Sequence, residues 1–272
     1  MKIRSVLIAV LLTFLASWAI AAPTNCPQHY FNGQAPDFLN EKYSQKTQEV
    51  CYRSYALIHS GLTRTPLTSA QHLTAGVLNQ KHAPRKDQFH PDPNIARADR
   101  AELKDYAKSG FDRGHMSPVG DMPDEESQKE SFSLANMIPQ NENSNENLWQ
   151  GIEEATRDLA KSSGELYVIT GPIFYGSDLK RLNERVLVPT YVFKAIYDPQ
   201  KNQGAVYLAA NTAGGRYAVV SIAEVERLTG ISLFPALANE VKQTPMALPK
   251  PTPNTRIAVT EDNTLVPRIP EP

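Results

Sequence analysis

Long apolar runs are almost absent from this sequence of 272 residues. The one long run, from Val6 to Ile20, lies near the N-terminus, and no later stretch approaches its length. A membrane-spanning helix needs about 20 predominantly apolar residues. The sequence therefore excludes a protein built from several membrane-spanning helices.

The N-terminal run has the features of a secretory signal peptide. Lys2 and Arg4 precede the apolar residues, which end in Ala19-Ile20-Ala21, the small-residue pattern of a cleavage site. We predict that residues 1–21 are a signal peptide cleaved near Ala21 or Ala22. The mature protein would then be secreted or periplasmic, with no membrane association. A membrane anchor is the alternative, but the run is short for one.

Cysteine is equally scarce, and its two occurrences are Cys26 and Cys51. In an oxidising compartment, two cysteines this close in sequence can close a modest loop. We predict a disulfide that ties the N-terminus to the first strand. Two free thiols are the alternative, which suits a reducing compartment.

The sequence has no excess of positive charge. Its formal net charge is −1, and loss of Lys2 and Arg4 would make it −3 (−1 − 2). This balance disfavours a tight nucleic-acid binder with a long footprint. Residues 81–115 hold eight basic and six acidic residues, and residues 116–160 hold two and ten. Net charges of +2 and −8 side by side suit a site for an anion and a divalent cation, although a solvated mixed surface is equally common.

One large domain is expected after the signal peptide, because the remaining 251 residues (272 − 21) show no internal repeat and no linker in their middle. The composition changes after Gln243. Residues 244–272 hold seven prolines and few large apolar residues, which is typical of an extended or disordered segment. We predict a domain over residues 22–243 and a dispensable, disordered tail over residues 244–272.

Runs rich in apolar, aromatic and β-branched residues, bounded by turn residues, indicate strands. They predict strands at 52–60, 66–75, 165–170, 186–198 and 204–212, with a turn at Asp198-Pro199 between the last two. Helices are predicted over 145–161 and from Ser221 to Gly230. Because strands and helices do not alternate, we predict an α+β fold with a central, largely antiparallel sheet and flanking helices.

An acid, a cation, a glycine and an imidazole occupy four consecutive positions, Asp112-Arg113-Gly114-His115. Imidazole has a pKa near neutrality and is the usual general base in catalysis. A lone histidine is more often a hydrogen-bonded structural residue. Its charged neighbours nevertheless make His115 a candidate catalytic base.

A second cluster of polar residues lies on the predicted helix. At about 100° per residue, the apolar residues form one stripe of Leu148, Ile152, Ala155 and Leu159. Asn145, Trp149 and Glu153 follow its edge at spacing i, i+4, i+8. The amide and the carboxylate could share a hydrated Mg²⁺, which favours oxygen ligands and keeps several waters. The alternative is a helix N-cap at Asn145 and an exposed Glu153.

Three motifs stand in order along the chain: DRGH at 112–115, Asn136-x-x-Pro139-Gln140 and Asn145-x-x-x-Trp149-x-x-x-Glu153. Together they resemble the DNA/RNA non-specific endonucleases, a family with a ββα-metal site that includes secreted bacterial nucleases and mitochondrial endonuclease G. The similarity extends to RKDQFHPDP at 85–93, TGPIF and SIAEVERLTGISLFP, and so covers roughly residues 50–235. It implies a ββα-metal motif within the α+β fold and a metal-dependent endonuclease.

The resemblance implies a metal site on the helix. Asn145 would be the main protein ligand of one Mg²⁺, with Mn²⁺ as an alternative ion, and Glu153 would orient the waters of the ion. Asparagines also stand at 141, 143 and 147, but only Asn145 lies four residues before Trp149 and eight before Glu153.

The resemblance also implies roles for residues outside the helix. His115 would activate a water for attack on phosphorus, and Asn136 would support the site by hydrogen bonds near the metal and His115. Arg113 and Arg85 would neutralise charge on the phosphate. Asp112 would have a structural role, and Gly114 would let the backbone turn.

The expected substrates are DNA and RNA. An imidazole, an arginine and one divalent metal supply what phosphodiester hydrolysis needs: an activated nucleophile and compensation of growing negative charge. No stripe that combines aromatic and basic residues stands out, and no recognition helix does. Contacts to phosphate alone carry no direct base information, so we expect little sequence specificity. The alternatives are an inactive nucleic-acid-binding protein of the same fold and a metal-dependent phosphodiesterase acting on small substrates.

Overall fold

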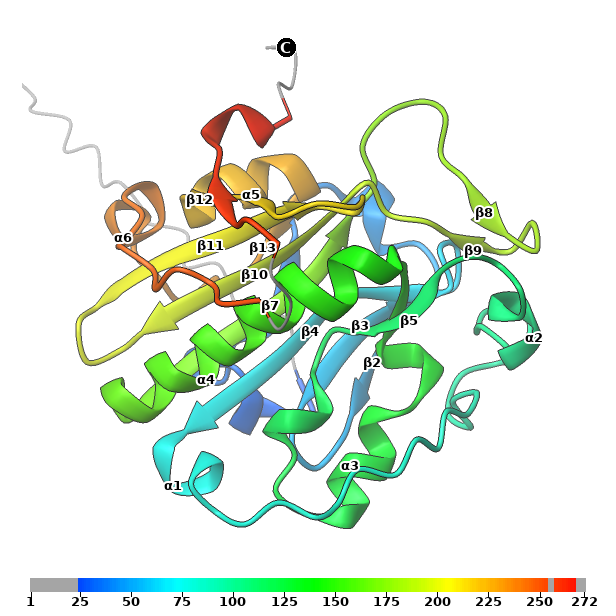
Figure 1. The fold of residues 1–272 in the computed structure, drawn as a ribbon, viewed down its shortest axis with the longest axis horizontal. Coiled ribbons are helices and arrows are strands. Elements are labelled where there is room, and N and C mark those ends of the chain that lie inside the picture. Colours follow the sequence, from blue (N-terminus) through cyan, green and yellow to red (C-terminus); the bar gives the residue numbers. More distant parts are fainter. Residues whose placement is uncertain (1–23, 254–256, 268–272) are drawn as a thin grey trace, which may run out of the picture.

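The computed structural model describes residues 24–253 and 257–267. An eight-stranded sheet in the order β14-β12-β11-β10-β7-β4-β3-β2 forms its centre (Figure 1). Neighbouring strands are antiparallel except β12 and β14, which run parallel. The predicted α+β fold with a largely antiparallel sheet and flanking helices is confirmed. The predicted signal peptide lies outside the described residues, and none of the helices within them is long and apolar enough to cross a membrane.

The strands of the large sheet are β2 (Thr47–Cys51), β3 (Ala56–Ser60), β4 (Thr65–Thr74), β7 (Glu165–Ile173), β10 (Tyr191–Asp198), β11 (Gln203–Ala210), β12 (Arg216–Val220) and β14 (Thr260–Glu261). Smaller pairs join β1 (Asp37–Phe38) to β13 (Ile231–Ser232), β5 (Asp112–His115) to β6 (Met137–Gln140), and β8 (Arg181–Leu182) to β9 (Val186–Leu187).

The α-helices are α1 (Ala75–Leu78), α2 (Leu103–Tyr106), α3 (Glu125–Ser131), α4 (Gln150–Ser163), α5 (Ile222–Thr229) and α6 (Asn239–Gln243). A π-helix, η6 (Ser144–Trp149), runs directly into α4. The 3-10 helices are η1 (Pro27–His29), η2 (Phe31–Gly33), η3 (Glu41–Ser44), η4 (Val119–Asp121), η5 (Leu134–Asn136) and η7 (Asn263–Leu265).

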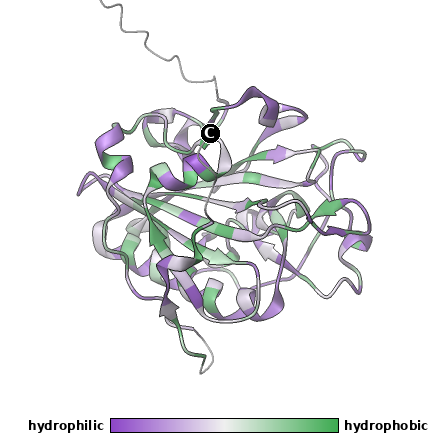
Figure 2. Ribbon diagram, turned by 90° about the horizontal axis from the view of Figure 1, so that it is seen from above, coloured by the Kyte–Doolittle hydropathy of each residue, from purple (hydrophilic) through white to green (hydrophobic). Residues whose placement is uncertain are grey.

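The central strands bury side chains on both faces of the sheet. On β10, Phe193 and Ala195 belong to a core shared with α5 and the N-terminal residues, whereas Val192 and Ile196 belong to a core shared with α4. This alternation is the period of two that a strand imposes. Figure 2 shows apolar residues along the inner strands and hydrophilic ones on much of the outer chain. Burial of each large apolar side chain contributes about 1.5–3 kcal/mol, which holds α4 against its face.

Local sequence signals explain the helix at 222–229. The Ser221 side chain accepts a hydrogen bond from the Glu224 backbone, and Gly230 ends the helix with φ 68°. A serine N-cap and a left-handed glycine C-cap are the expected termini. The prediction of a helix between these two residues is confirmed.

Three of the predicted strands have different boundaries in the structure. The segment 186–198 is broken between β9 and β10 around Pro189, because proline fixes φ and donates no ladder hydrogen bond. The strand predicted at 165–170 instead continues through Pro172 to Ile173, with Pro172 paired to Val192. The run 52–60 is also shorter than predicted, since β3 begins at Ala56.

The predicted disulfide is present. Cys26 is bonded to Cys51, with the Cα atoms 5.7 Å apart. Because Cys51 is the last residue of β2, the bond ties the N-terminal 3-10 helices to the edge of the large sheet.

The prediction of a disordered tail over 244–272 is wrong for the described parts of that segment, 244–253 and 257–267, which we call the C-terminal strap. Met246 donates a backbone hydrogen bond to Gly204 (2.9 Å), and Pro249 accepts one from the Tyr207 hydroxyl (2.5 Å). Met246, Leu248 and Ile257 pack against the core beneath α4, and β14 extends the sheet. The large apolar residues of the strap pack against the two cores of the sheet, which composition alone does not show.

Candidate active site

The predicted ββα arrangement is present in the chain. Strands β5 and β6 pair antiparallel, with Asp112 opposite Gln140 and His115 opposite Met137. Helices η6 and α4 follow β6 within a few residues. These elements surround a cavity of about 580 Å³.

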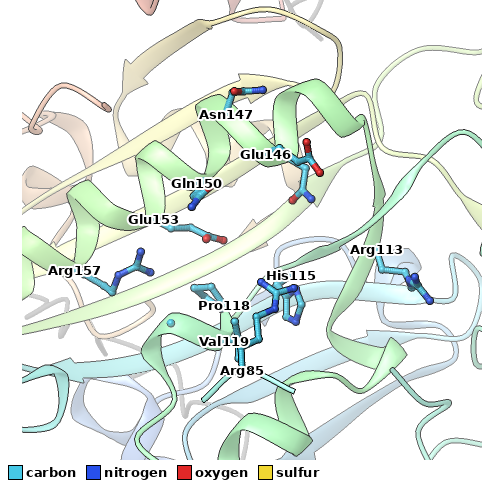
Figure 3. A pocket seen from close by; sticks show the side chains of 12 residues that line it. Arg85, Arg113, His115, Pro118, Val119, Glu146, Asn147, Gln150, Glu153 and Arg157 are labelled. Carbon is cyan, nitrogen blue, oxygen red and sulfur yellow. The ribbon is translucent and has the colours of Figure 1, made fainter. Parts of the chain in front are cut away.

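Arg85, Arg113, His115, Asn145 and Glu153, five of the predicted site residues, line this cavity. In Figure 3 the side chains of His115 and Arg85 lie opposite those of Glu153 and Arg157. We call Arg85, Arg113 and His115 the β5 wall, and Asn145, Glu153 and Arg157 the α4 wall. The fold thus brings together residues up to 72 positions apart (157 − 85).

His115 lies among aromatic rings. Its ring meets Phe132 edge-on at 5.1 Å and Phe89 at 5.7 Å. Nε2 is buried and has no hydrogen-bond partner among the described residues. Burial lowers the pKa of His115 to about 3, and the positive charge of Arg85 acts in the same direction. The imidazole is therefore neutral at neutral pH, the state in which it can accept a proton.

Asn145 is held by the acid of the DRGH motif. Its Nδ2 donates to Oδ2 of Asp112 at 2.9 Å. This bond occupies the nitrogen end of the amide and leaves Oδ1 for a ligand. The alternative of an N-cap at Asn145 is not what the structure has, because Asn141 Oδ1 accepts the bond from the Ser144 backbone instead.

Glu153 follows Asn145 by two turns on the same wall. Its carboxylate makes no hydrogen bond and no ion pair with another described residue. Burial raises the pKa of Glu153 to about 7, while the positive charges of Lys194 and Arg157 oppose that rise. An unpaired carboxylate in such a place has a strong tendency to take up a cation.

The helical turn that carries Asn145 is not α-helical. Residues Ser144–Trp149 form a π-helix, and α4 begins at Gln150. The apolar stripe nevertheless forms as predicted: Leu148, Ile152 and Ala155 are buried, and Leu159 is partly buried. Trp149 is fully buried. Single π-helical turns inside helices are rare and occur mostly at functional sites.

Asn136 is the one predicted site residue that the fold keeps out of the cavity. It is fully buried, and its side chain donates to the carbonyls of Ser117 (2.8 Å) and Ser131 (3.0 Å). Its oxygen accepts from the Ser117 backbone (2.9 Å) and from Ser69 (3.2 Å). These four bonds fill the capacity of the amide. Asn136 therefore fixes the chain two residues after His115 and cannot contact a metal.

Gly114 does not make a turn, contrary to our expectation, because it lies inside β5. A Cβ at this position would stand 2.0 Å from Oε1 of Gln140, which lies on β6 opposite Asp112. Glycine is required for this close approach.

A comparison with sequence families decides the identity. A family model described as DNA/RNA non-specific endonuclease matches residues 34–240. The chain belongs to this family. The resemblance inferred from the three motifs is confirmed, and the relatives that this chain matches are named as nucleases.

The chain also matches individual relatives. It is 32% identical over 226 residues to Nuclease C1 of Cunninghamella echinulata var. echinulata, covering 75% of this chain and 85% of that protein. It is 31% identical over 210 residues to the mitochondrial Nuclease EXOG of Danio rerio, covering 70% of this chain but only 61% of the relative. A chain of the solved EndoG/EndoGI complex, described as showing the mechanism of EndoG inhibition, superposes with a TM-score of 0.67 at 26% identity, covering 72% and 89% of the two chains.

The donor atoms of the cavity suit a hard divalent cation. The α4 wall offers the amide oxygen of Asn145 and the carboxylate of Glu153, and Glu146 lies beside them. Such a small number of protein oxygen ligands suits Mg²⁺, because this ion keeps several of its waters when it binds to a protein. The group Cys26, Glu49 and Cys51 is the one cluster of three His, Cys, Asp or Glu side chains close enough to hold a metal within the described residues. Because its cysteines form the disulfide, it offers no thiolate pair.

Two charged residues of the site escaped our sequence reasoning. Arg157 lines the cavity and is paired with Asp121 at 3.1 Å. Its position four residues after Glu153 on the same helix was the available signal. Lys194 is fully buried in β10, donates to Thr170 at 2.8 Å and lies 5.5 Å from the Trp149 ring. No sequence signal separates it from an exposed strand lysine.

Proposed function

We propose that the protein is a secreted or periplasmic, Mg²⁺-dependent endonuclease that hydrolyses phosphodiester bonds of DNA and RNA with little sequence specificity. The observation that supports this most is the meeting in one cavity of a neutral His115, three arginines and the free amide oxygen of Asn145. These are a proton acceptor, compensation for an anion and a cation ligand.

His115 is the general base in this proposal. Its neutral imidazole takes a proton from water as the water oxygen attacks phosphorus and the ester oxygen departs. Because Nε2 is enclosed, we infer that Nδ1 accepts this proton. A phosphate in the cavity adds negative charge beside the ring and raises the pKa of His115 towards neutrality, which strengthens the base when substrate is bound.

The arginines hold the phosphate. Arg113 makes no ion pair among the described residues and extends over the Phe89 ring, so its donors are available. Arg85 and Arg157 stand at the same cavity, each already paired with one carboxylate, Asp87 or Asp121. Fixed guanidinium groups stabilise the charge that grows on the non-bridging oxygens.

Asn145 and Glu153 would hold the metal ion. Asp112 fixes the amide of Asn145, and the carboxylate of Glu153 would accept hydrogen bonds from the ion's water shell. When bound, the ion supplies positive charge that polarises a phosphate oxygen and stabilises the departing one.

The deciding experiment is cleavage of plasmid DNA and of total RNA by the purified mature protein, with Mg²⁺ and with EDTA, beside His115→Ala. We expect degradation of both polymers that needs Mg²⁺ and falls by about 10²- to 10⁴-fold in the variant. Retention of DNA on a filter without cleavage would favour an inactive binding protein instead. Hydrolysis of an aryl phosphate diester but of neither polymer would favour a phosphodiesterase for small substrates.

A panel of unrelated duplexes and single strands would test the proposed lack of sequence specificity. Cutting confined to one sequence motif would refute it.

Export is tested by sequencing the N-terminus of the mature protein recovered from the medium or the periplasm. We expect it to begin next to Ala21 or Ala22.

A further inference from the structure

Folding assembles cations and aromatic rings that the sequence keeps apart. Three cations each lie over a phenylalanine ring: Arg85 over Phe132 at 5.6 Å, Arg113 over Phe89 at 4.1 Å, and Lys180 over Phe111 at 4.8 Å. Arg85 and Arg113 line the cavity. These residues come from segments between positions 85 and 180. A stripe of aromatic and basic residues is therefore present in space although none is visible along the chain.

The order of this row follows from β5. Phe111, Arg113 and His115 occupy alternate positions, so they fall on one face of the extended chain, spaced roughly 7 Å apart. Lys180 lies over Phe111, on the side of Arg113 that is away from His115. In Figure 3, Arg113 lies at the opposite end of the labelled residues from Arg157, with His115 between them. The row thus leads from the cavity past Arg113 to Lys180.

The rings under the cations are fixed in place. Phe89 and Phe111 pack against a buried cluster that includes Leu134, Met137 and Leu182. Leu182 belongs to β8, which starts directly after Lys180. The lysine and the ring beneath it are consequently anchored to the same cluster.

The chemistry of the row selects an anion. Arg113 and Lys180 make no ion pair among the described residues, whereas Arg85 is paired with Asp87 at 2.6 Å. A cation over a ring gains about 0.5–1 kcal/mol at an exposed site and keeps its N–H donors free for a phosphate. A cation lies over one face of each ring, Phe132 is fully buried, and Phe89 and Phe111 pack against a buried cluster. These rings therefore do not offer the open face that base stacking needs.

We propose that Lys180 is a phosphate-binding residue of the substrate path, in which a polynucleotide runs from the cavity over Arg113 to Lys180. This inference rests on the proposed function and adds a contact outside the catalytic cavity. Lys180 binds a backbone phosphate to one side of the scissile bond. The contact favours substrates long enough to reach it and carries no base information.

The test compares Lys180→Ala with Lys201→Ala, which removes the same charge from the turn between β10 and β11. That turn lies on the opposite side of Figure 1 from β8 and β9. KM and kcat are measured on long duplex DNA. The Kd of the same DNA is measured against salt in a His115→Ala background.

We expect Lys180→Ala to raise KM and Kd up to about fivefold and to leave kcat unchanged. The slope of log Kd against log salt should fall by roughly 0.9, the share of one phosphate of duplex DNA. Lys180→Glu should raise KM further, and Lys201→Ala should match the parent protein.

Equal KM and equal salt slopes in Lys180→Ala and Lys201→Ala would overturn the inference, even if the parent enzyme cuts DNA. Failure of the proposed function is separate: the parent protein would then cut neither DNA nor RNA, while the Kd measurement would still report on Lys180.

Discussion

The two walls of the cavity differ in the charge that they are built to receive. On the β5 wall, two arginines and an imidazole contact phenylalanine rings. Within the described residues, the one ion pair of this wall joins Arg85 to Asp87. On the α4 wall, an amide and carboxylates stand beside one arginine. In the proposed function, the anionic substrate and the metal cation would therefore be held from opposite sides of the cavity.

The walls also respond differently to burial. The pKa of His115 falls to about 3 and that of Glu153 rises to about 7, in both cases chiefly because the charged form loses water. Each wall thus carries a central group that is easily made neutral and gains from an opposite charge: a phosphate beside His115 and a cation beside Glu153.

The strongest way to break this comparison is to remove one member of each wall. Arg113→Ala and Asn145→Ala should each lower kcat/KM by about 10²- to 10³-fold, the cost of losing one group that stabilises transition-state charge. Asn145→Ala should also raise the Mg²⁺ concentration for half-maximal activity, whereas Arg113→Ala should not. A Mg²⁺ titration of both variants measures this. Equal Mg²⁺ requirements would contradict a division of labour between the walls.

Asp112→Ala sharpens the comparison, because Asp112 lies on β5 but its carboxylate serves Asn145 on the α4 wall. Loss of such a supporting hydrogen bond lowers metal affinity or activity by about 10- to 100-fold. We expect the Mg²⁺ requirement to rise as it does in Asn145→Ala, but by less. Asp112→Asn is the matched control for shape. An unchanged Mg²⁺ requirement would show that Asn145 needs no such support.

Gly151→Ala tests what holds the α4 wall from behind. A Cβ on Gly151 would stand 2.8 Å from the backbone oxygen of Thr252 in the C-terminal strap. Such overpacking costs about 1–3 kcal/mol, and we expect a lower unfolding free energy and a higher Mg²⁺ requirement. Gly164→Ala is no suitable control because Gly164 has φ 94°. Gly76→Ala is suitable, because a Cβ there meets nothing within 4 Å.

The smallest expected effect is on the pH dependence of the unfolding free energy, to which His115 and Glu153 should contribute slopes of opposite sign. Below pH 6.5 the unfolded chain binds a proton at His115 that the folded chain refuses, so this histidine costs stability as the pH falls. Between pH 4.5 and 7 the folded chain keeps a proton on Glu153 that the unfolded chain has lost, so this glutamate costs stability as the pH rises. Each slope is at most about 1.4 kcal/mol per pH unit.

Urea unfolding in EDTA between pH 5 and pH 6.5 separates the two slopes. Glu153→Gln leaves the histidine slope, so its unfolding free energy should rise with pH relative to the parent protein. His115→Ala leaves the glutamate slope, so its unfolding free energy should fall with pH. If the unfolding free energies of the two variants changed with pH in the same way, the opposite pKa shifts of His115 and Glu153 would be refuted.

The sequence predicted the parts of the site that are local in the chain. His115 and Arg113 lie two residues apart on one strand, and Asn145 and Glu153 lie about two turns apart along η6 and α4, so elementary geometry places each pair. The capped helix after Ser221 and the turn at Asp198 were readable for the same reason.

The parts that were missed depend on contacts between distant segments. The hydrogen bond from Asn145 to Asp112 spans 33 residues, and the rings beneath Arg113 and Lys180 belong to other segments of the chain. The strap was predicted to be disordered because residues 244–272 hold seven prolines and few large apolar residues, yet the sheet and α4 supply apolar partners for it. The motif that contains Asn136 did not show that this residue is fully buried outside the cavity, where it hydrogen-bonds the backbone of Ser117.

The π-helix at Ser144–Trp149 makes the site sensitive to chain length as well as to chemistry. Relative to an α-helix, such a turn accommodates an extra residue in its i→i+5 bonding. Loss of one codon within it would allow an unbroken α-helix to form, with the buried stripe after Gln150 unchanged. The same deletion would change which side chains of this turn face the cavity, a set that now includes Asn145 and Glu146. A change in chain length alone would thus alter the proposed cation site without changing any residue of the β5 wall.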